Sequence, residues 1–140
     1  MPELDTVCNI AKRVWAFPNT SVGLTIGILG VLFGGKMQIK RECVEFHGGL
    51  VQWLLQKMPT GSGALAMTLG HTILGQTEDA LEITRDHEHV HVRQYERWGP
   101  LFVPAYLFAS IWAWLHGGHY YRDNVFEKEA FGEADYGSKT

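Results

Sequence analysis

Two histidines and a glutamate near the middle of the chain have the spacing of a metal site. Residues Asp86 to Tyr95 read Asp-His-Glu-His-Val-His-Val-Arg-Gln-Tyr, in which His87, Glu88 and His91 spell the pattern His-Glu-x-x-His. On a helix, residues four apart lie on one side, so both imidazoles can bind one zinc ion. Three protein ligands leave a position for water, and its pKa falls when it binds. The pattern therefore predicts one Zn²⁺ as cofactor, with Glu88 as the general base that takes a proton from water.

The flanking residues predict that this motif lies on a long helix. Thr77 to Asp79 offer N-cap oxygens and Gly99-Pro100 stops a helix, so we expect the metal-binding helix over about residues 79–98. One stripe of it should face the interior, namely Ile83, His87, Val90, His91, Gln94 and Trp98. The other side should face solvent, namely His89, Arg93, Glu96 and Arg97. The alternative is that the inward histidines are only hydrogen-bonded core residues.

A third ligand is expected from a later carboxylate. Glu127 lies 36 residues beyond His91, and on the helix predicted after Asn124 it shares a face with apolar residues, whereas Glu129 turns away. Glu127 is therefore the favoured ligand, and Glu129 and Glu133 are the alternatives. Asn124 and Glu127 also fit an N-cap with its reciprocal glutamate, in which case Glu127 would only close the start of a helix.

Several other polar residues are candidates for contacts with a substrate. Residues 64–74 alternate like a strand directly before the metal-binding helix, so they could border the cleft and pair with an extended peptide. His71 on this strand could orient a ligand or a substrate, or it could be one polar residue of an ordinary half-buried strand. The candidates for an oxyanion donor are His119, Tyr120, Tyr121 and Arg122, and the sequence does not favour one of them.

The remaining patterns predict the α+β class, with one mostly helical domain over residues 1–140. Apolar helices are expected at 21–35, starting at Pro18-Asn19-Thr20, and at 101–116, and a third-ligand helix at 125–135. Alternation predicts a small antiparallel sheet from 36–47, as a hairpin, and 64–74. The glycines of the first apolar helix, Gly23, Gly27 and Gly30, should form a face that lets another backbone approach closely.

The composition argues against one class of partner and favours one cellular compartment. A net charge of -3 with 19% charged residues predicts no nucleic-acid partner. Cys8 and Cys43 form no Cys-x-x-Cys pair, which favours a reducing, cytoplasmic compartment over a thiolate zinc site or a disulfide framework. The acidic first residues do not fit a cleavable signal peptide.

Two apolar stretches leave membrane association open. Residues 21–35 and 101–115 are apolar for about 15 residues, less than the ~20 that usually span a bilayer. They are either core helices or membrane-embedded ones. Trp112, Trp114 and Tyr106 would suit a shallowly inserted helix. The predicted location is cytoplasmic, with membrane association as the alternative.

The motif residues resemble those of the zincin metallopeptidases, in particular the gluzincin branch with its CAAX-prenyl-protease-like group. There a His-Glu-x-x-His helix is followed by a helix with Glu-x-x-Ala-Asp, whose first glutamate is the third zinc ligand. The resemblance implies a zincin-like domain, with His87, His91 and Glu127 as ligands and Glu88 as base. Phe131 departs from the pattern, because the aspartate expected there supports a ligand histidine. Residues 64–135 also resemble a set of short bacterial proteins without an assigned substrate.

Three functions fit these patterns. The first is a zinc-dependent metallopeptidase or peptidase-like hydrolase that acts on a peptide or protein through a metal-activated water. The second is a module that binds zinc without catalysis. The third is a membrane-associated subunit of a larger assembly, whose apolar segments dock on partner helices. The sequence indicates neither the peptide nor the oligomeric state.

Overall fold

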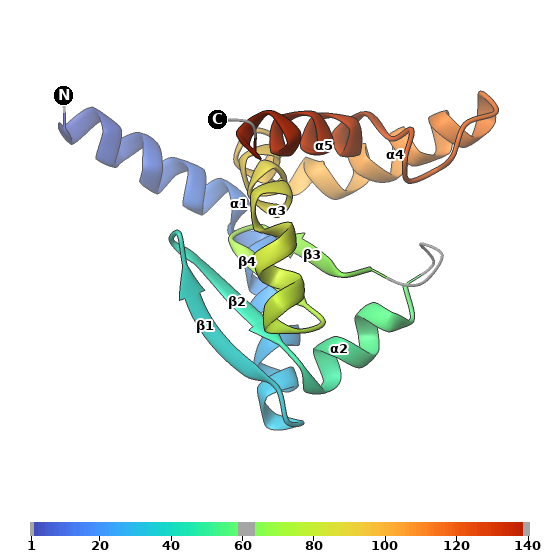
Figure 1. Cartoon of the computed structure of the whole chain (residues 1–140). Helices are drawn as coiled ribbons and strands as arrows, with labels where there is room; N and C mark the ends of the chain where they lie inside the picture. Colours follow the sequence, from blue (N-terminus) through green and yellow to red (C-terminus); the bar gives the residue numbers. More distant parts are fainter. Residues whose placement is uncertain (1, 59–63, 139–140) are drawn as a thin grey trace.

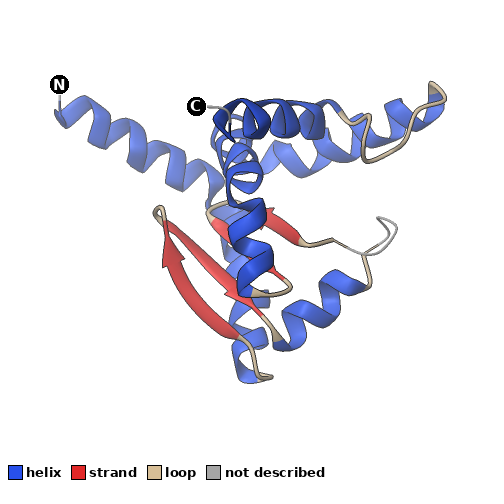
Figure 2. Cartoon of the chain, viewed as in Figure 1, coloured by secondary structure: helices blue, strands red, loops and turns tan. Residues whose placement is uncertain are grey.

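A four-stranded sheet lies between helices in the computed structural model, which describes the backbone of residues 2–58 and 64–138 and the side chains of residues 3–58 and 64–132 (Figures 1 and 2). The helices are α1 (Pro2–Leu32), α2 (Gly49–Gln56), α3 (Glu78–Trp98), α4 (Phe102–Leu115) and α5 (Val125–Ser138), with a 3-10 turn η1 (Gly99–Leu101) before α4. The strands are β1 (Lys36–Lys40), β2 (Cys43–His47), β3 (Ala66–Leu69) and β4 (Thr72–Gly75). The predicted α+β class, mostly helical with one small sheet, is confirmed.

The strands form one mixed sheet in the order β1-β2-β4-β3. The hairpin predicted over 36–47 is present as the antiparallel pair β1 and β2. The single strand predicted over 64–74 is wrong, because the chain reverses at Gly70, whose φ of 62° lies in the left-handed region. β4 then pairs with β2 in parallel. The predicted antiparallel sheet is therefore wrong for this pair of strands. β3 is an edge strand.

Helices cover both faces of this sheet. Phe46 and Leu74 point to the side of α1 and α2, where they pack with Val51 and Leu55. The neighbouring residue Ile73 points the other way and packs against residues of α3, including Leu81. In Figure 1, α1 accordingly passes behind the sheet and α3 in front of it.

The glycine face predicted on the first apolar helix is confirmed. A Cβ added at Gly27 would lie 2.2 Å from the ring of Phe46, and one at Gly23 would lie 2.8 Å from Thr72. Gly30 faces Val51 of α2 in the same way. The second half of α1 therefore lies directly on the sheet and on α2, at a distance that side chains would prevent.

Helix α1 runs through Pro18, so the helix start predicted at residues 18–20 and the bounds 21–35 are wrong. Contacts on both sides of the proline hold the helix together. Ala16 is fully buried, and Asn19 Nδ2 donates a hydrogen bond of 3.1 Å to the carbonyl of Gly99. Trp15 packs on the same glycine. These contacts outweigh the backbone hydrogen bond that a proline removes.

Helix α3 confirms the helix predicted over about 79–98. Thr77 is its N-cap, where the side-chain oxygen accepts a hydrogen bond of 3.1 Å from the amide of Ala80. At the other end, Gly99 adopts a φ of 55° and the chain leaves the helix. Both ends follow the expected signals.

The predicted inward stripe of α3 is wrong at its two ends. Ile83 is 78% exposed and Trp98 is 43% exposed, whereas His89, predicted to face solvent, is half-buried. The reason is that α3 has two covered sides. Leu81 and Val92 pack on the sheet, and the motif histidines face α5. A single stripe cannot represent two buried sides.

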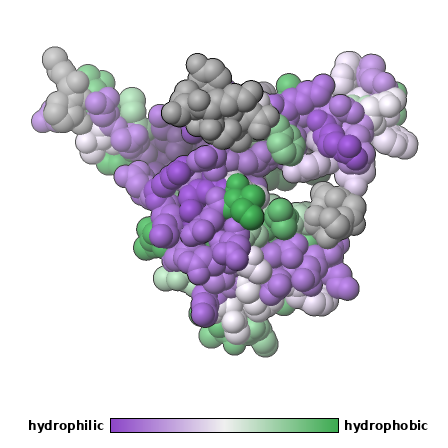
Figure 3. Space-filling view, in the orientation of Figure 1, coloured by the Kyte–Doolittle hydropathy of each residue, from purple (hydrophilic) through white to green (hydrophobic). Residues whose placement is uncertain are grey.

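Two helical stretches are long and apolar enough to cross a membrane by length and composition, Glu3–Leu32 and Glu78–Leu115. Only 22% and 17% of the residues in their apolar windows are buried. Helix α4 buries Phe102 and Ala113, while its other apolar residues lie mostly at the surface. By contrast, the face that Figure 3 shows over α3 and the β1–β2 hairpin is mainly hydrophilic.

Candidate metal centre

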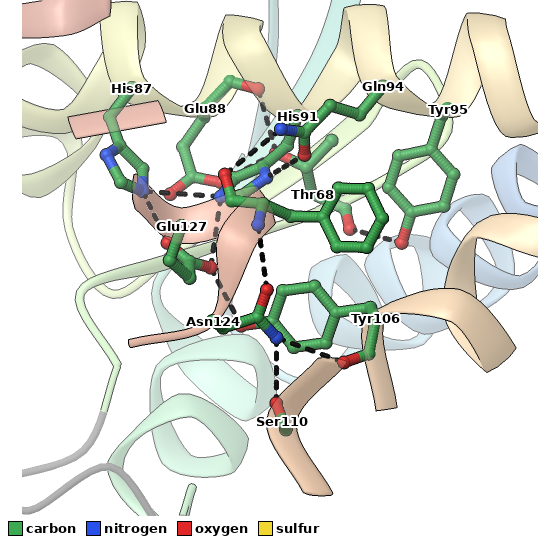
Figure 4. A network of polar contacts seen from close by, with 11 residues as sticks. Thr68, His87, Glu88, His91, Gln94, Tyr95, Tyr106, Ser110, Asn124 and Glu127 are labelled. Atoms are coloured by element: carbon green, nitrogen blue, oxygen red, sulfur yellow. Dashed lines mark hydrogen bonds and ion pairs between the residues drawn. The ribbon is translucent and has the colours of Figure 1, made fainter. Parts of the chain in front are cut away.

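The predicted ligands His87, His91 and Glu127 converge between α3 and α5 (Figure 4). Nε2 of His87 lies 3.0 Å from Oε2 of Glu127, and Nε2 of His91 lies 3.1 Å from Oε1 of the same carboxylate. The two Nε2 atoms are 3.3 Å apart. Three side chains from distant parts of the chain thus direct their donor atoms at one point.

The spacing of these atoms fits a tetrahedral ion. Zinc binds imidazole nitrogen and carboxylate oxygen at about 2.0–2.1 Å, which sets neighbouring ligand atoms of a tetrahedron about 3.3 Å apart. Each imidazole nitrogen faces a different oxygen of Glu127, at 3.0 and 3.1 Å, and the two nitrogens are 3.3 Å apart, which is close to that edge. One ligand atom from each of the three residues lies within 4.8 Å of the other two. Two neutral imidazoles and one carboxylate are also a donor set that zinc prefers.

Gln94 fixes the orientation of His91. Its amide nitrogen donates a hydrogen bond of 3.0 Å to the carbonyl of Phe126, so its oxygen faces His91. The Nδ1–H of His91 then donates to that oxygen at 2.8 Å. This bond keeps the proton on Nδ1 and leaves the lone pair of Nε2 available to a metal ion. Gln94 is fully buried, so its orientation is fixed.

Glu127 is held by the start of α5 and by Tyr106. Asn124 caps α5, because its Oδ1 accepts a hydrogen bond of 2.9 Å from the amide of Phe126. Glu127 does not bond back to the cap as in a reciprocal pair. It turns to the histidines instead, so the alternative that it only closes a helix start is wrong. The hydroxyl of Tyr106 donates to Oε1 of Glu127 at 2.7 Å.

The charges of the cluster shift the pKa values of its members. Burial acts to raise the pKa of Glu127, but hydrogen bonds from His87, His91 and Tyr106 outweigh it and lower the pKa to about 2. Burial acts to lower the pKa of His91, but the hydrogen bond to Glu127 and the charges of Glu88 and Glu127 raise it to about 9. At neutral pH, His91 is therefore protonated and Glu127 is ionised.

Glu88 lies beside the ligands and is itself buried, with 5% of its surface exposed. Its Oε2 accepts a hydrogen bond of 2.6 Å from the hydroxyl of Thr68 on β3. Glu88 also lines a cavity of about 340 Å³ together with His91 and Glu127. A small molecule in this cavity can reach the ligands and the predicted base at once.

The cavity is apolar apart from the metal centre. Strand β3 forms one wall through Ala66, Met67, Thr68 and Leu69, and α4 forms another through Phe102, Val103, Tyr106 and Leu107. The prediction that the strand before the metal-binding helix borders the cleft is therefore confirmed for residues 66–69. Such a lining favours an apolar group of a ligand.

Of the four predicted oxyanion donors, Tyr121 alone lines this cavity. Burial, together with the Glu127 carboxylate, raises the pKa of Tyr121, so its hydroxyl keeps its proton at neutral pH. His119 is exposed and stacks on Tyr120, with ring centroids 4.6 Å apart. The side chain of Arg122 is exposed as well.

Two further predicted site residues point elsewhere. His71 lies in the turn between β3 and β4, where its Nε2 is 3.0 Å from Oε1 of Glu96. It does not line the apolar cavity. Glu129, the alternative ligand, forms an ion pair with Arg97 at the surface. The side chain of Glu133, the other alternative, lies outside the described residues.

Phe131 takes a structural part in the site. Its ring centroid lies 4.4 Å from that of His87, so it packs against the first ligand. Where the resemblance implies a carboxylate that bonds to a ligand, this chain has an aromatic ring without a hydrogen-bonding group. Packing, rather than a hydrogen bond from this position, orients the histidine.

Three residues of the centre were not identified as functional from the sequence: Gln94, Tyr106 and Thr68. Gln94 had a usable signal, because it follows His91 by three positions and so lies on the same face of the helix. Tyr106 and Thr68 come from other elements. No local pattern connects them to Glu127 and Glu88.

Comparisons with protein-family models, with curated proteins and with solved structures found no match for this chain. The resemblance to the gluzincins therefore stays a prediction that depends on the motif residues. The geometry of the cluster is the independent observation, since it follows from how the chain folds.

Proposed function

We propose that this protein is a zinc-dependent hydrolase that acts on a peptide or protein substrate. The observation that carries the proposal is the convergence of His87, His91 and Glu127 beside Glu88, at the end of a cavity that a substrate can enter. A zinc ion held by these three side chains would lower the pKa of a bound water molecule and polarise the carbonyl group of a substrate.

The residues of the chain have distinct parts in this reaction. Glu88 accepts the proton of the attacking water and later gives it to the leaving amine. Tyr121 lines the cavity near Glu127 and keeps its proton, so its hydroxyl can donate to the oxygen on which negative charge develops. Gln94 and Tyr106 act on the ligands, by orienting His91 and Glu127.

Strand β3 supports a peptide as the substrate. It is the edge strand of the sheet and forms a wall of the cavity. An edge strand offers main-chain donors and acceptors to an extended chain, and the apolar lining offers a place for a side chain. The main chain of this strand can therefore form hydrogen bonds with the amide groups of a peptide substrate.

The test compares Glu88→Gln with the wild type. We expect Glu88→Gln to retain its zinc content and to lose hydrolysis of a quenched fluorescent peptide mixture by a factor of about 10²–10⁴. Glu82→Gln is the matched control, because Glu82 is exposed on the same helix. Equal turnover by the wild type and Glu88→Gln would contradict the proposal.

The second candidate is a zinc-binding module without catalysis. One observation favours it, namely the short hydrogen bond from Thr68 to Glu88, which gives the glutamate a structural partner. In this case the wild type binds zinc and hydrolyses no peptide. Glu88→Gln would then change only the stability of the protein.

We further propose a cytoplasmic protein that attaches to a membrane through α4. Residues 98–121 contain no Asp, Glu, Lys or Arg. Six exposed residues of α4 are large and apolar, namely Leu107, Phe108, Ile111, Trp112, Trp114 and Leu115. The 14 residues of α4 extend about 21 Å, less than the ~30 Å of a hydrocarbon core. Shallow insertion therefore suits α4 better than spanning.

Vesicle flotation tests this attachment. We expect the wild type to float with phosphatidylcholine vesicles in high salt, and a double variant Ile111→Ser, Trp112→Ser to remain in the soluble fraction. Val7→Ser is the control, because Val7 is equally apolar and 64% exposed but lies on α1. A wild type that stays soluble would refute the attachment.

A further inference from the structure

Thr68 is the residue of β3 that contacts the predicted base. Its hydroxyl donates a hydrogen bond of 2.6 Å to Oε2 of Glu88 and lies 3.3 Å from the main-chain oxygen of the same residue (Figure 4). Both residues are buried, each with 5% of its surface exposed. Hydrogen bonds from a hydroxyl to a carboxylate are among the short and strong ones. The carboxylate of Glu88 is thus held from the sheet and not from its own helix.

The bond uses one oxygen of the carboxylate and leaves the other free. In the residues that the structure describes, Thr68 is the only hydrogen-bond partner of this carboxylate. Glu88 also lines the apolar cavity together with His91 and Glu127. The terminal torsion of a glutamate has no sharp preference, so a carboxylate without a fixed partner takes several orientations. The bond from Thr68 fixes Oε2 and so leaves Oε1 as the proton acceptor that a general base needs.

A second contact with α3 holds Thr68 itself in place. The hydroxyl of Tyr95 donates a hydrogen bond of 2.9 Å to the carbonyl oxygen of Thr68. Tyr95 is buried and lies on α3 about two turns beyond Glu88. Helix α3 therefore fixes the main chain of Thr68 through Tyr95, and the side chain of Thr68 in turn fixes Glu88.

A threonine suits this position on β3 for two reasons. Its branched side chain is stiff at χ1, so the strand sets the direction of the hydroxyl. The hydroxyl is also a neutral donor, so it orients the carboxylate without bringing a positive charge to the candidate metal centre. Valine has nearly the same shape but no donor, which makes it the substitution that isolates the hydroxyl.

We propose that Thr68 is a positioning residue, which orients the carboxylate of Glu88 towards the water that attacks the substrate. The inference rests on the proposed hydrolase. In a zinc-binding module without catalysis, the same bond would contribute only to stability. In the hydrolase, loss of the bond leaves Glu88 present but misoriented. The chemical step then slows, while zinc and substrate still bind.

Steady-state hydrolysis by the zinc-loaded full chain tests this role, with a fluorescent peptide that the wild type cleaves. We expect Thr68→Val to lower kcat about 10- to 100-fold and to change KM by less than about twofold. Thr68→Ser restores the hydroxyl and should recover most of the loss. Zinc affinity, measured by competition with a chromogenic chelator, should be unchanged in both variants. Thr25→Val is the matched control, because Thr25 is exposed on α1 and its hydroxyl bonds within that helix.

A double-variant cycle shows whether Thr68 acts through Glu88. In the Glu88→Gln protein, Thr68→Val should cause no further loss of the residual kcat, because no base is left to orient. A thermal melt shows whether Thr68→Val folds. Tyr95→Phe takes its place if it does not, since it keeps the hydroxyl of Thr68 but frees the main chain. It should lower kcat by a smaller factor at the same KM.

The outcomes separate this inference from the proposed function. A wild type that hydrolyses no peptide removes the proposed function and the inference together. An active wild type whose kcat is retained in Thr68→Val, or in Tyr95→Phe where that variant is needed, overturns the inference alone. The same holds if Thr68→Ser is as slow as Thr68→Val, or if Thr68→Val slows the Glu88→Gln protein further.

Discussion

At the scale of single residues, the geometry of the site depends on the candidate ligands and equally on the side chains that orient them. His91 donates its Nδ1–H to Gln94, and Gln94 is fixed in turn by the carbonyl of Phe126. Partners of this kind set the orientation and the tautomer of a ligand histidine. Their loss should therefore weaken metal binding without removing a ligand.

Replacing Gln94 tests this dependence. We expect Gln94→Ala to reduce zinc affinity about 10- to 100-fold, measured by competition with a chromogenic chelator. Gln94→Glu, which keeps an acceptor for His91, should recover part of the loss. Gln56→Ala, at an exposed position of α2, should have no effect. Equal affinity in Gln94→Ala and the wild type would show that His91 needs no such support.

The proton shared by His91 and Glu127 should make zinc binding depend on pH. His91 has a pKa raised to about 9 in the metal-free protein, so zinc must displace its proton below that pH. Apparent affinity should rise about tenfold per pH unit up to pH 9 and then level off. Chelator competition between pH 6.5 and 9.5 measures this. A flat profile would contradict the raised pKa.

Stability of the metal-free protein should change in the opposite direction. A pKa raised from 6.5 to about 9 in the folded state means that the folded protein holds the proton more tightly than the unfolded chain. This contribution is fully present below pH 6.5 and is lost as pH rises towards 9. The lowered pKa of Glu127 adds a contribution present above its ordinary value and lost only as pH falls towards 2. Urea unfolding of the metal-free protein should therefore show decreasing stability from pH 6.5 to 9.

At the scale of elements, close contact between α1 and the sheet depends on glycine. A Cβ at Gly27 would lie 2.2 Å from the ring of Phe46, which is fully buried and cannot move freely. We expect Gly27→Ala to lower the free energy of unfolding by about 1–3 kcal/mol in urea titrations. Gly132→Ala is the control, since no atom lies within 4 Å of its added Cβ, and it should be neutral or slightly stabilising. An unchanged midpoint for Gly27→Ala would contradict this packing.

The elements that the sequence predicted correctly are those with local signals. Helix α3 has a capping threonine and a terminal glycine, and the hairpin of β1 and β2 has strict alternation. The continuity of α1 through Pro18 was missed, because it depends on contacts with Gly99, far along the chain. The turn at Gly70 had a signal in the glycine itself.

The three candidate ligands were predictable and their surroundings were not. His87 and His91 follow from helical spacing, and Glu127 from the face of a later helix. The packing of α4 and β3 brings Tyr106 to Glu127 and Thr68 to Glu88, and it leaves His71 outside the site. No local sequence pattern encodes this packing. The parallel pairing of β2 with β4 is likewise a property of the assembled sheet.

At the scale of the whole molecule, the candidate metal centre connects two parts of the chain. His87 and His91 belong to α3 and Glu127 to α5, with α4 between them in sequence. A metal bound there would join α3 to α5. Because the three ligands meet only in the folded state, the metal would stabilise that state and not the unfolded chain. Zinc at about 100 times its dissociation constant should add about 2.7 kcal/mol, or roughly 8 °C in the unfolding temperature. Glu127→Ala should lose most of this shift in a thermal melt.

The central claim is that two imidazoles and one carboxylate bind a single ion. X-ray absorption spectroscopy of the zinc-loaded full chain tests it directly. The account predicts one zinc per chain with nitrogen and oxygen neighbours at about 2.0–2.1 Å, including the scattering pattern of two imidazoles. Glu127→Ala should change this spectrum. A protein that binds no zinc, a first shell containing sulfur, or a spectrum identical in Glu127→Ala would contradict the account.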